Sequence, residues 1–340
     1  MLTELKKNMK KIVLIILGYI LLISNSFALE EGPEEITFGA SIPNFKTVNG
    51  LGTAIDLDDF TFVSHGGDQS QKIDSLTPAI SAKFFNEQGN GGFELNILNG
   101  ANSSSVILDG TVGLAIYLDV IPITGVASPG AYRGGVVGTL NVKQEINMFN
   151  IVSFKKLDSI PENFTFLEKF NPEIGLMINR TSYEISVDDT FASPSLYHLG
   201  ETVTSKSLGP VLSLYKEKKL NDINTKLFLG SKLALLATTE TLNGDQSGVS
   251  NNYNVTDKYD HLSGRLKLTA GFIKKNEQGS NFYITGSIDI ANDVSSIENP
   301  RCVAGQDCDS AEYAGTAIPA HLKRQFTVSP SFMIGYKKTF

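Results

Sequence analysis

Apolar and polar residues alternate with a period of two in several segments of the chain. In the segment 282–291, large apolar residues fall on one face and mainly small polar residues on the other, and 265–272 and 326–336 repeat this pattern. Alternation over roughly ten residues is typical of half-buried β-strands. The sequence therefore predicts an all-β protein.

Alternation alone leaves two architectures open. In a soluble secreted β-rich protein, the apolar face of each strand packs against a second sheet. In a transmembrane barrel, the apolar face meets lipid and the small polar face lines the lumen. Beyond residue 28 no apolar run approaches 18 residues, the length that would indicate a membrane-spanning helix.

The first 28 residues have the pattern of a secretory signal peptide. Lysines cluster between residues 6 and 11, an apolar run covers 12–23, and Ser26 and Ala28 supply small residues before a cleavage point. The alternative is an N-terminal membrane anchor, but the run is shorter than the ~20 residues of a spanning helix. We expect residues 1–28 to be removed and residues 29–340 to form one exported domain.

The last predicted strand ends close to the C-terminus on alternating apolar residues. Phe332, Ile334 and Tyr336 share one face, Gly335 lies on the other, and Phe340 is the final residue. This arrangement resembles the C-terminal assembly signal of Gram-negative bacterial outer-membrane β-barrel proteins. The resemblance covers the general class and identifies no single family.

The resemblance implies a fold, a location and partners. The fold is a closed antiparallel transmembrane β-barrel with short periplasmic turns and long extracellular loops, and the location is the bacterial outer membrane. The implied partners are outer-membrane lipid and the barrel assembly machinery. A host or surface ligand is unknown from the sequence, and no nucleic acid is expected.

Counting upward and downward strands gives about 12, with a range of 10–14. An even number is expected because both ends of the barrel lie on the periplasmic side. The strand centres fall near residues 40, 81, 95, 114, 140, 175, 185, 211, 230, 268, 286 and 332. Short turns are predicted at 86–91, 217–222 and 275–279, and longer polar segments at 156–170, 188–205, 240–260 and 293–323.

Charged residues on the small polar faces of these strands are predicted to line the lumen. They are Lys83, Glu94, Lys143, Glu173, Lys226, Lys232, Arg265, Lys267, Asp289 and Lys337. Two interpretations stay open: the charges pair and fill a closed interior, or they line an aqueous pore with a modest anion preference. The strand number does not decide, because about 8 strands leave a filled interior and 16–18 leave a channel.

The charge distribution agrees with an exported protein. The net charge of −7 includes four Lys and one Glu within residues 1–28, so the remainder holds 25 basic and 35 acidic residues. An acidic domain of this kind is not a basic nucleic-acid binder. Only 19% of all residues are charged, below the roughly 25% usual for soluble domains.

Two cysteines, Cys302 and Cys308, stand in the last long loop. In the oxidising periplasm, such a pair predicts a disulfide that closes a small surface loop. Asp307 and Asp309 beside them leave a metal clip as the alternative. No His lies nearby in the sequence, so a zinc site is disfavoured.

The sequence contains no convincing catalytic arrangement. Asp260 and His261, with Asp257 nearby, could imitate an acid–base pair, but adjacent residues on a strand point to opposite faces. We therefore predict no enzyme, no cofactor and no metal. The favoured function is an outer-membrane surface protein with exposed loops and at most a narrow pore, ahead of a general diffusion porin with anion preference.

Overall fold

The structure is a computed structural model. It describes residues 35–42, 45–46, 54–56, 62–63, 72–73, 77–86, 88–109, 114–118, 131–134, 137–157, 169–189, 198–220, 224–247, 253–275, 281–298, 301–302, 317–318 and 321–337. The predicted signal peptide lies outside these residues and stays a prediction. Among the described residues, no helix is both long and apolar enough to cross a membrane.

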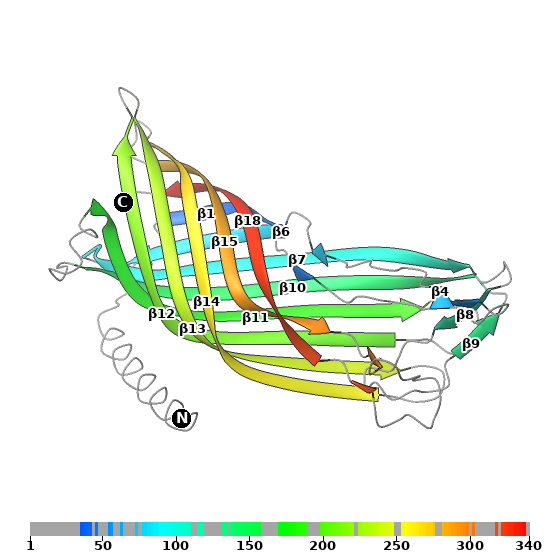
Figure 1. Cartoon of the computed structure of the whole chain (residues 1–340). Helices are drawn as coiled ribbons and strands as arrows, with labels where there is room; N and C mark the ends of the chain where they lie inside the picture. The colour runs from blue at the N-terminus through cyan, green and yellow to red at the C-terminus, as the bar shows by residue number, and fades with distance from the viewer. Residues whose placement is uncertain are drawn as a thin grey trace, which may run out of the picture.

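Ten antiparallel strands form a closed barrel (Figure 1). In spatial order they are β1 (Glu35–Ser41), β18 (His321–Lys337), β15 (Asn281–Glu298), β14 (Tyr253–Lys275), β13 (Thr225–Ser247), β12 (His198–Lys219), β11 (Asn171–Asp189), β10 (Val137–Lys156), β7 (Gly91–Asp109) and β6 (Thr77–Phe85). The prediction of an all-β closed antiparallel barrel is confirmed.

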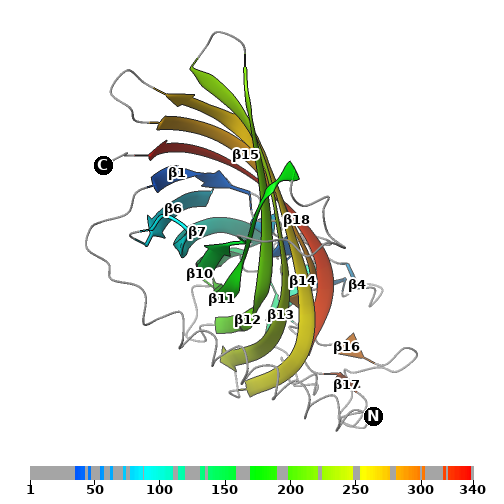
Figure 2. The same ribbon diagram turned by 90° about the vertical axis from the view of Figure 1, so that its left-hand side faces the viewer.

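The short strand β1 closes the sheet. Its residues 35–41 pair with 331–337 of β18 on one side and with 77–83 of β6 on the other. Figure 2 shows β1 between these two strands, with the wall continuing through β7, β10 and β11. The first and last strands of the barrel are therefore neighbours.

Three small sheets lie outside the barrel wall. They contain β2 (Phe45–Lys46) with β5 (Lys72–Ile73), β16 (Arg301–Cys302) with β17 (Ala317–Ile318), and the order β4 (Phe62–Val63), β3 (Ala54–Asp56), β8 (Leu114–Leu118), β9 (Ala131–Gly134). In Figure 1, β4, β8 and β9 lie at the end of the barrel where β7 and β10 have their tips.

The strand number of about 12 is too high, for two identifiable reasons. The predicted strand near residue 114 is β8, which belongs to a small sheet outside the barrel. The two strands predicted near 175 and 185 are a single strand, β11. The remaining predicted centres each fall on one strand of the ten.

An apolar belt covers the outside of the barrel. Its exposed large side chains come from nine of the ten strands: Phe38, Ile80, Ile97, Phe149, Ile174, Ile178, Leu229, Leu233, Leu235, Leu262, Leu268, Phe272, Phe282, Ile284, Ile288, Phe326, Val328, Phe332, Ile334 and Tyr336. Soluble proteins rarely expose a contiguous apolar surface of this extent. The apolar faces of the strands therefore meet lipid and do not pack against a second sheet.

The strands are longer than the membrane requires. On β14 the outward apolar residues run from Leu262 to Phe272, with Asp260 above and Lys274 below. A tilted strand crosses the bilayer in roughly 9–11 residues, whereas β14 has 23. The part of β14 before Leu262, which we call its upper part, therefore extends beyond the lipid.

The hydrophobic pattern inverts where the strands leave the lipid. On β11, Ile174 and Ile178 point outward within the belt, whereas Tyr183 and Ile185 point inward above it. A strand in the bilayer has its apolar face outside, and a strand surrounded by water has it inside. The apolar residues thus move from the outer to the inner face within one continuous strand. In the sequence this looks like the end of one strand and the start of another, which explains why β11 is predicted as two strands.

The connections differ from their predicted lengths. The segment predicted as a loop at 240–260 is mostly strand, because β13 runs to Ser247 and β14 begins at Tyr253. β10 ends and β11 begins at the same end of the barrel as the short turns after β6, β12 and β14, and we call this the short-turn end. β1, β7 and β15 run toward the opposite end, which we call the long-loop end.

The residues of the predicted assembly signal occupy β18. Phe332, Ile334 and Tyr336 point outward and are exposed, whereas Gly335 points inward. A Cβ atom on Gly335 would clash with Cγ2 of Thr37 on β1, so the close pairing of these strands leaves no room for a side chain. Phe340 lies outside the described residues, and the signal itself stays a prediction.

The belt predicts where a charge is tolerated on the outer surface. Leu268→Arg places a guanidinium at the middle of the belt and should lower the free energy of unfolding by about 2–4 kcal/mol. Thr256→Arg, an outward position on the same strand above the belt, should change it by less than about 1 kcal/mol. Urea titration of the protein folded into lipid vesicles measures both values, and equal losses would contradict the assigned belt.

Candidate functional site in the barrel interior

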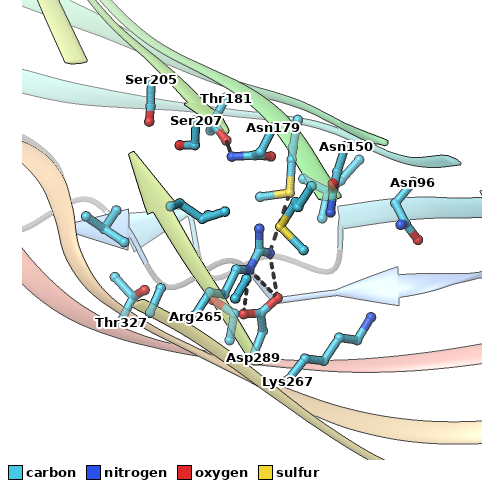
Figure 3. A pocket seen from close by; sticks show the side chains of 18 of the residues that line it. Asn96, Asn150, Asn179, Thr181, Ser205, Ser207, Arg265, Lys267, Asp289 and Thr327 are labelled. Atoms are coloured by element: carbon cyan, nitrogen blue, oxygen red, sulfur yellow. Dashed lines mark hydrogen bonds and ion pairs between the residues drawn. The ribbon is translucent and has the colours of Figure 1, made fainter. Parts of the chain in front are cut away.

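The strongest interior ion pair joins two neighbouring strands. Arg265 of β14 donates from Nε to both carboxylate oxygens of Asp289 on β15, at 2.8 and 3.0 Å, and from Nη2 to Oδ2 at 2.5 Å (Figure 3). Bidentate pairs of this kind are among the strongest polar contacts in proteins. Both side chains are largely buried.

Two further ion pairs cross the lumen. Lys232 Nζ of β13 lies 2.9 Å from Glu94 Oε2 of β7, and Lys83 Nζ of β6 lies 3.7 Å from Glu173 Oε2 of β11. Three strands separate β13 from β7 around the barrel wall, and two separate β6 from β11. These pairs therefore bridge the interior and restrict its width.

Two cavities meet at this layer of charges. The smaller, of about 190 Å³, lies toward the long-loop end and is lined by Arg265 and Asp289. The larger, of about 940 Å³, lies toward the short-turn end and is lined by Lys83 and Glu173. Glu94, Lys232 and Lys267 line both.

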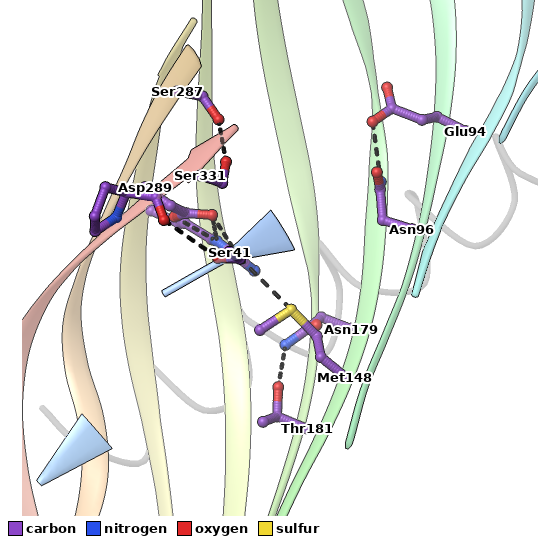
Figure 4. Close-up of polar contacts among 11 residues, drawn as sticks. Ser41, Glu94, Asn96, Met148, Asn179, Thr181, Ser287, Asp289 and Ser331 are labelled. Carbon is purple, nitrogen blue, oxygen red and sulfur yellow. Dashed lines mark hydrogen bonds and ion pairs between the residues drawn. The ribbon is translucent and has the colours of Figure 1, made fainter. Parts of the chain in front are cut away.

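The walls of the smaller cavity combine apolar side chains with many uncharged polar groups. Asn96, Asn150 and Asn179 come from three adjacent strands, and serine and threonine hydroxyls fill much of the remaining wall (Figure 3). Several of these groups bond to one another, as Asn179 does with Thr181 (Figure 4) and as Thr238 does with Ser207 and Ser263. Their hydrogen bonds are thus partly used within the wall.

Above the smaller cavity the interior is filled by side chains. Ile146, Ile185 and Leu242 are fully buried there. Buried side chains from nine strands contribute to this upper interior or its border: Thr77, Leu98, Ile146, Ile185, Leu199, Leu242, His261, Ile297 and Thr327. Of these residues, Leu98 and Thr327 border the smaller cavity, and the others line neither of the two cavities.

A buried polar cluster ties the upper ends of β15 and β18 to β13 and β14. Ser295 donates its backbone N–H and its hydroxyl to Glu240, and the backbone N–H of Leu322 donates to Asp257 at 2.9 Å. His261 Nδ1 lies 3.9 Å from Glu240. The register of β15 with β18 shifts between Ala291 and Val294, just before the strand reaches this cluster.

Glu201 is a buried carboxyl group above the membrane belt. It points inward from β12, is 2% exposed, and its Oε2 makes no hydrogen bond. The residues paired with it across the sheet, Ile185 and Gly244, offer no polar side chain. Burial raises the pKa of Glu201 from 4.5 to about 7.

Seven of the ten residues predicted to line the lumen also line one of the two cavities. They are Lys83, Glu94, Glu173, Lys232, Arg265, Lys267 and Asp289. Lys226 pairs with Glu217 at 2.6 Å near the short-turn end. The structure describes only the backbone of Lys337.

Lys143 was predicted to face the lumen, but its side chain points outward. It is 61% exposed above the belt, where it pairs with Glu145, while Gln144 and Ile146 point inward. The inversion of the hydrophobic pattern explains this error, because the polar face is the outer face at this height.

The structure describes only one of the two cysteines of the predicted pair. Cys302 lies in β16, where it pairs with Ala317 of β17, and Cys308 lies outside the described residues. The disulfide therefore stays a prediction. Within the described residues, no group of three or more His, Cys, Asp or Glu side chains is arranged to hold a metal ion.

Sequence analysis did not identify two polar features that depend on strand pairing: the buried carboxyl group of Glu201 and a cluster on the outer surface. The sequence does not indicate the burial of Glu201, because its environment depends on residues from neighbouring strands. On the outer surface, His198 Nδ1 lies 2.7 Å from Asp188, and its Nε2 lies 3.5 Å from Asp245. These three residues come from three adjacent strands.

Asp260 and His261 do point in opposite directions. Asp260 accepts a hydrogen bond from Thr239 Oγ1 at 2.6 Å on the outer surface, whereas the side chain of His261 is buried inside. These two residues do not form an acid–base pair.

Comparisons with known proteins identify the fold class without a family. No protein-family model matches the chain, and no curated protein matches it significantly. Among solved structures, the chain is similar to the outer-membrane protease OmpT of Escherichia coli, with 10% identity, 93% of this chain and 100% of that chain covered, and a TM-score of 0.40. It is also similar to the toluene transporter TodX of Pseudomonas putida, with 9% identity, coverage of 93% and 91%, and a TM-score of 0.23.

The closed barrel and its outward apolar belt agree with the predicted general class, outer-membrane β-barrel proteins. The prediction that the chain is not an enzyme is contradicted, because one of the similar structures is a protease. Similarity at this level assigns neither activity to the present chain.

The pKa of Glu201 predicts how stability changes with pH. The folded barrel holds this proton more tightly than the unfolded chain, so stability from this group is greatest below pH 4.5 and falls as pH rises to about 7. The loss is roughly 3 kcal/mol. Glu201→Gln should be more stable than the parent at pH 8 and similar to it at pH 4, measured by urea unfolding.

The matched control is Glu184→Gln, since Glu184 is exposed on the outer surface of β11. It should leave the pH dependence of unfolding unchanged. A parent and Glu201→Gln variant with parallel pH profiles would contradict the burial of an isolated carboxyl group.

The bidentate pair predicts a second effect on stability. Asp289→Asn leaves the Arg265 charge buried without its partner and should cost about 3–5 kcal/mol. The double variant Arg265→Met/Asp289→Leu removes both charges and should be more stable than the single variant. Unfolding of all three proteins in vesicles tests this, and a double variant weaker than Asp289→Asn would count against it.

Proposed function

We propose that this protein is an outer-membrane surface protein whose barrel is closed to solutes. The function is to hold its long-loop end and the upper ends of its strands outside the membrane. The filled upper interior carries this proposal, because Ile146, Ile185 and Leu242 are fully buried at the height where a channel would need water.

The interior charges support the same interpretation. Glu94, Glu173 and Asp289 line the cavities, and each of these carboxylates already has a cationic partner. Two of the three pairs bridge the lumen and would obstruct a passing solute. Between the two interpretations derived from the sequence, paired charges in a closed interior fit better than an aqueous pore.

The strands themselves support a role outside the membrane. β12, β13 and β14 contain 22, 23 and 23 residues, about twice the number needed for crossing. Above the belt, their outer face is polar, and their inward face combines buried apolar side chains such as Leu199 and Leu242 with the buried Glu201 and Glu240. The resulting platform presents polar surface to the medium.

Conductance distinguishes the closed barrel from the alternative, a diffusion porin with modest anion preference. The purified protein in a planar lipid bilayer should show no stepwise conductance. Insertion is checked in parallel by heat-modifiable migration on a detergent gel. Discrete conductance steps from folded protein would overturn the closed barrel and favour the porin.

Surface labelling tests the orientation. In a Cys302→Ser/Cys308→Ser background, Asn254→Cys at the long-loop end should react with a membrane-impermeant maleimide on intact cells. Asn224→Cys at the short-turn end is equally exposed in the barrel and should react only after the outer membrane is permeabilised. The reverse labelling pattern would refute the proposed orientation.

A further inference from the structure

Among the described residues, Lys267 is the one cavity-lining cation for which no hydrogen bond or ion pair of the side chain is found. Lys156, which is exposed at the edge of the larger cavity, donates to the Gly89 carbonyl at 2.7 Å. Asp289 lies directly opposite it on β15, but Asp289 is occupied by Arg265. Glu94 also lies nearby but is bonded to Lys232. In Figure 3, Lys267 extends away from the Arg265–Asp289 pair.

The strand register makes this position electrostatically unfavourable. Lys267 of β14 is the direct partner of Lys232 on β13, and like charges directly opposite each other in a sheet destabilise it. Arg265, two residues away on the same face, adds a third positive charge. Glu94 and Asp289 oppose these three cations, and Glu173 is paired with Lys83. Among the described charges inside the barrel that are not exposed, one positive charge is therefore left unmatched.

The larger cavity brings this charge together with apolar surface. Lys267 lines it, as do five aromatic side chains: Phe85, Phe170, Tyr215, Phe228 and Tyr283. Its volume of about 940 Å³ falls in the range of small-ligand sites. Its lining also includes Asn171 and Glu217, close to the short-turn end, so a ligand would enter from that side.

We propose that the larger cavity binds a small monocarboxylate with an apolar or aromatic body. The carboxylate accepts hydrogen bonds from the Lys267 ammonium, and the apolar body packs on the aromatic wall. One negative charge matches the single unmatched positive charge. The hydroxyls of Thr269 and Ser287, which line the same cavity, can donate to the second carboxylate oxygen.

Such a site is compatible with a barrel that conducts nothing. The cavity lies on the short-turn side of the charge layer, and the filled interior lies on the other side. Ligand binding therefore does not depend on the proposed surface function, and neither result decides the other.

The test uses 4-fluorobenzoate as the probe and the full chain folded in detergent micelles. Fluorine NMR follows its saturable binding, and 4-fluorobenzyl alcohol serves as the uncharged probe with the same ring. We expect 4-fluorobenzoate to bind at one site and about tenfold or more tightly than the alcohol, since a hydrogen bond to a charged group contributes about 1.5–3 kcal/mol.

Variants locate the site. Lys267→Met should weaken 4-fluorobenzoate binding about tenfold or more, whereas Lys258→Met, an exposed lysine on the outer face of the same strand, should leave it unchanged. Heat-modifiable migration verifies that both variants are folded. If Lys267→Met does not fold, Lys267→Gln and the comparison of the two probes on the parent protein take its place.

Three results would overturn the proposal. The first is equal binding of 4-fluorobenzoate and 4-fluorobenzyl alcohol. The second is unchanged 4-fluorobenzoate binding in folded Lys267→Met or Lys267→Gln. The third is a change in the fluorine signal that does not saturate and that micelles without protein reproduce.

Discussion

The structure depends on one constraint: inside lipid, every backbone N–H and C=O group must find a partner in the protein. A sheet meets this condition only when it has no free edge, so β1 is decisive although it has only seven residues. It supplies hydrogen bonds to β18 on one side and to β6 on the other. The outward apolar belt is then possible because no polar backbone edge is left to face lipid.

Closure with ten strands also determines the interior. The lumen is narrow enough for side chains from opposite walls to meet, as Lys232 and Glu94 do. Water is largely excluded at the upper level, and buried apolar side chains replace it there. Ionisable groups that remain inside are therefore expected to be paired, and Lys267 and Glu201 depart from that rule.

Much of the wall was predictable from the sequence, because alternation identifies a strand and its two faces. Segments such as 282–291 lie within the belt, where the apolar face is always outside, and their predicted direction agrees with the exposed Phe282, Ile284 and Ile288. The rule fails above the lipid. Lys143 was assigned to the lumen because the sequence alone does not show at which residue a strand leaves the membrane.

The candidate site was predictable in composition but not in arrangement. Arg265, Lys267 and Asp289 stand on inward faces that the sequence reveals. Their pairing depends on the register of β14 with β15 and β13, which the sequence does not specify. For this reason neither the isolated charge of Lys267 nor the isolated carboxyl of Glu201 could be recognised beforehand.

Cross-linking of the first and last strands tests the closed barrel most directly. Phe38 and Ile334 are register partners on the outer face of β1 and β18. In a protein without Cys302 and Cys308, the pair Phe38→Cys/Ile334→Cys should form a disulfide on oxidation of the folded barrel, whereas Phe38→Cys/Val328→Cys should not. Absence of the first cross-link in folded protein, or equal formation of both, would contradict closure through β1.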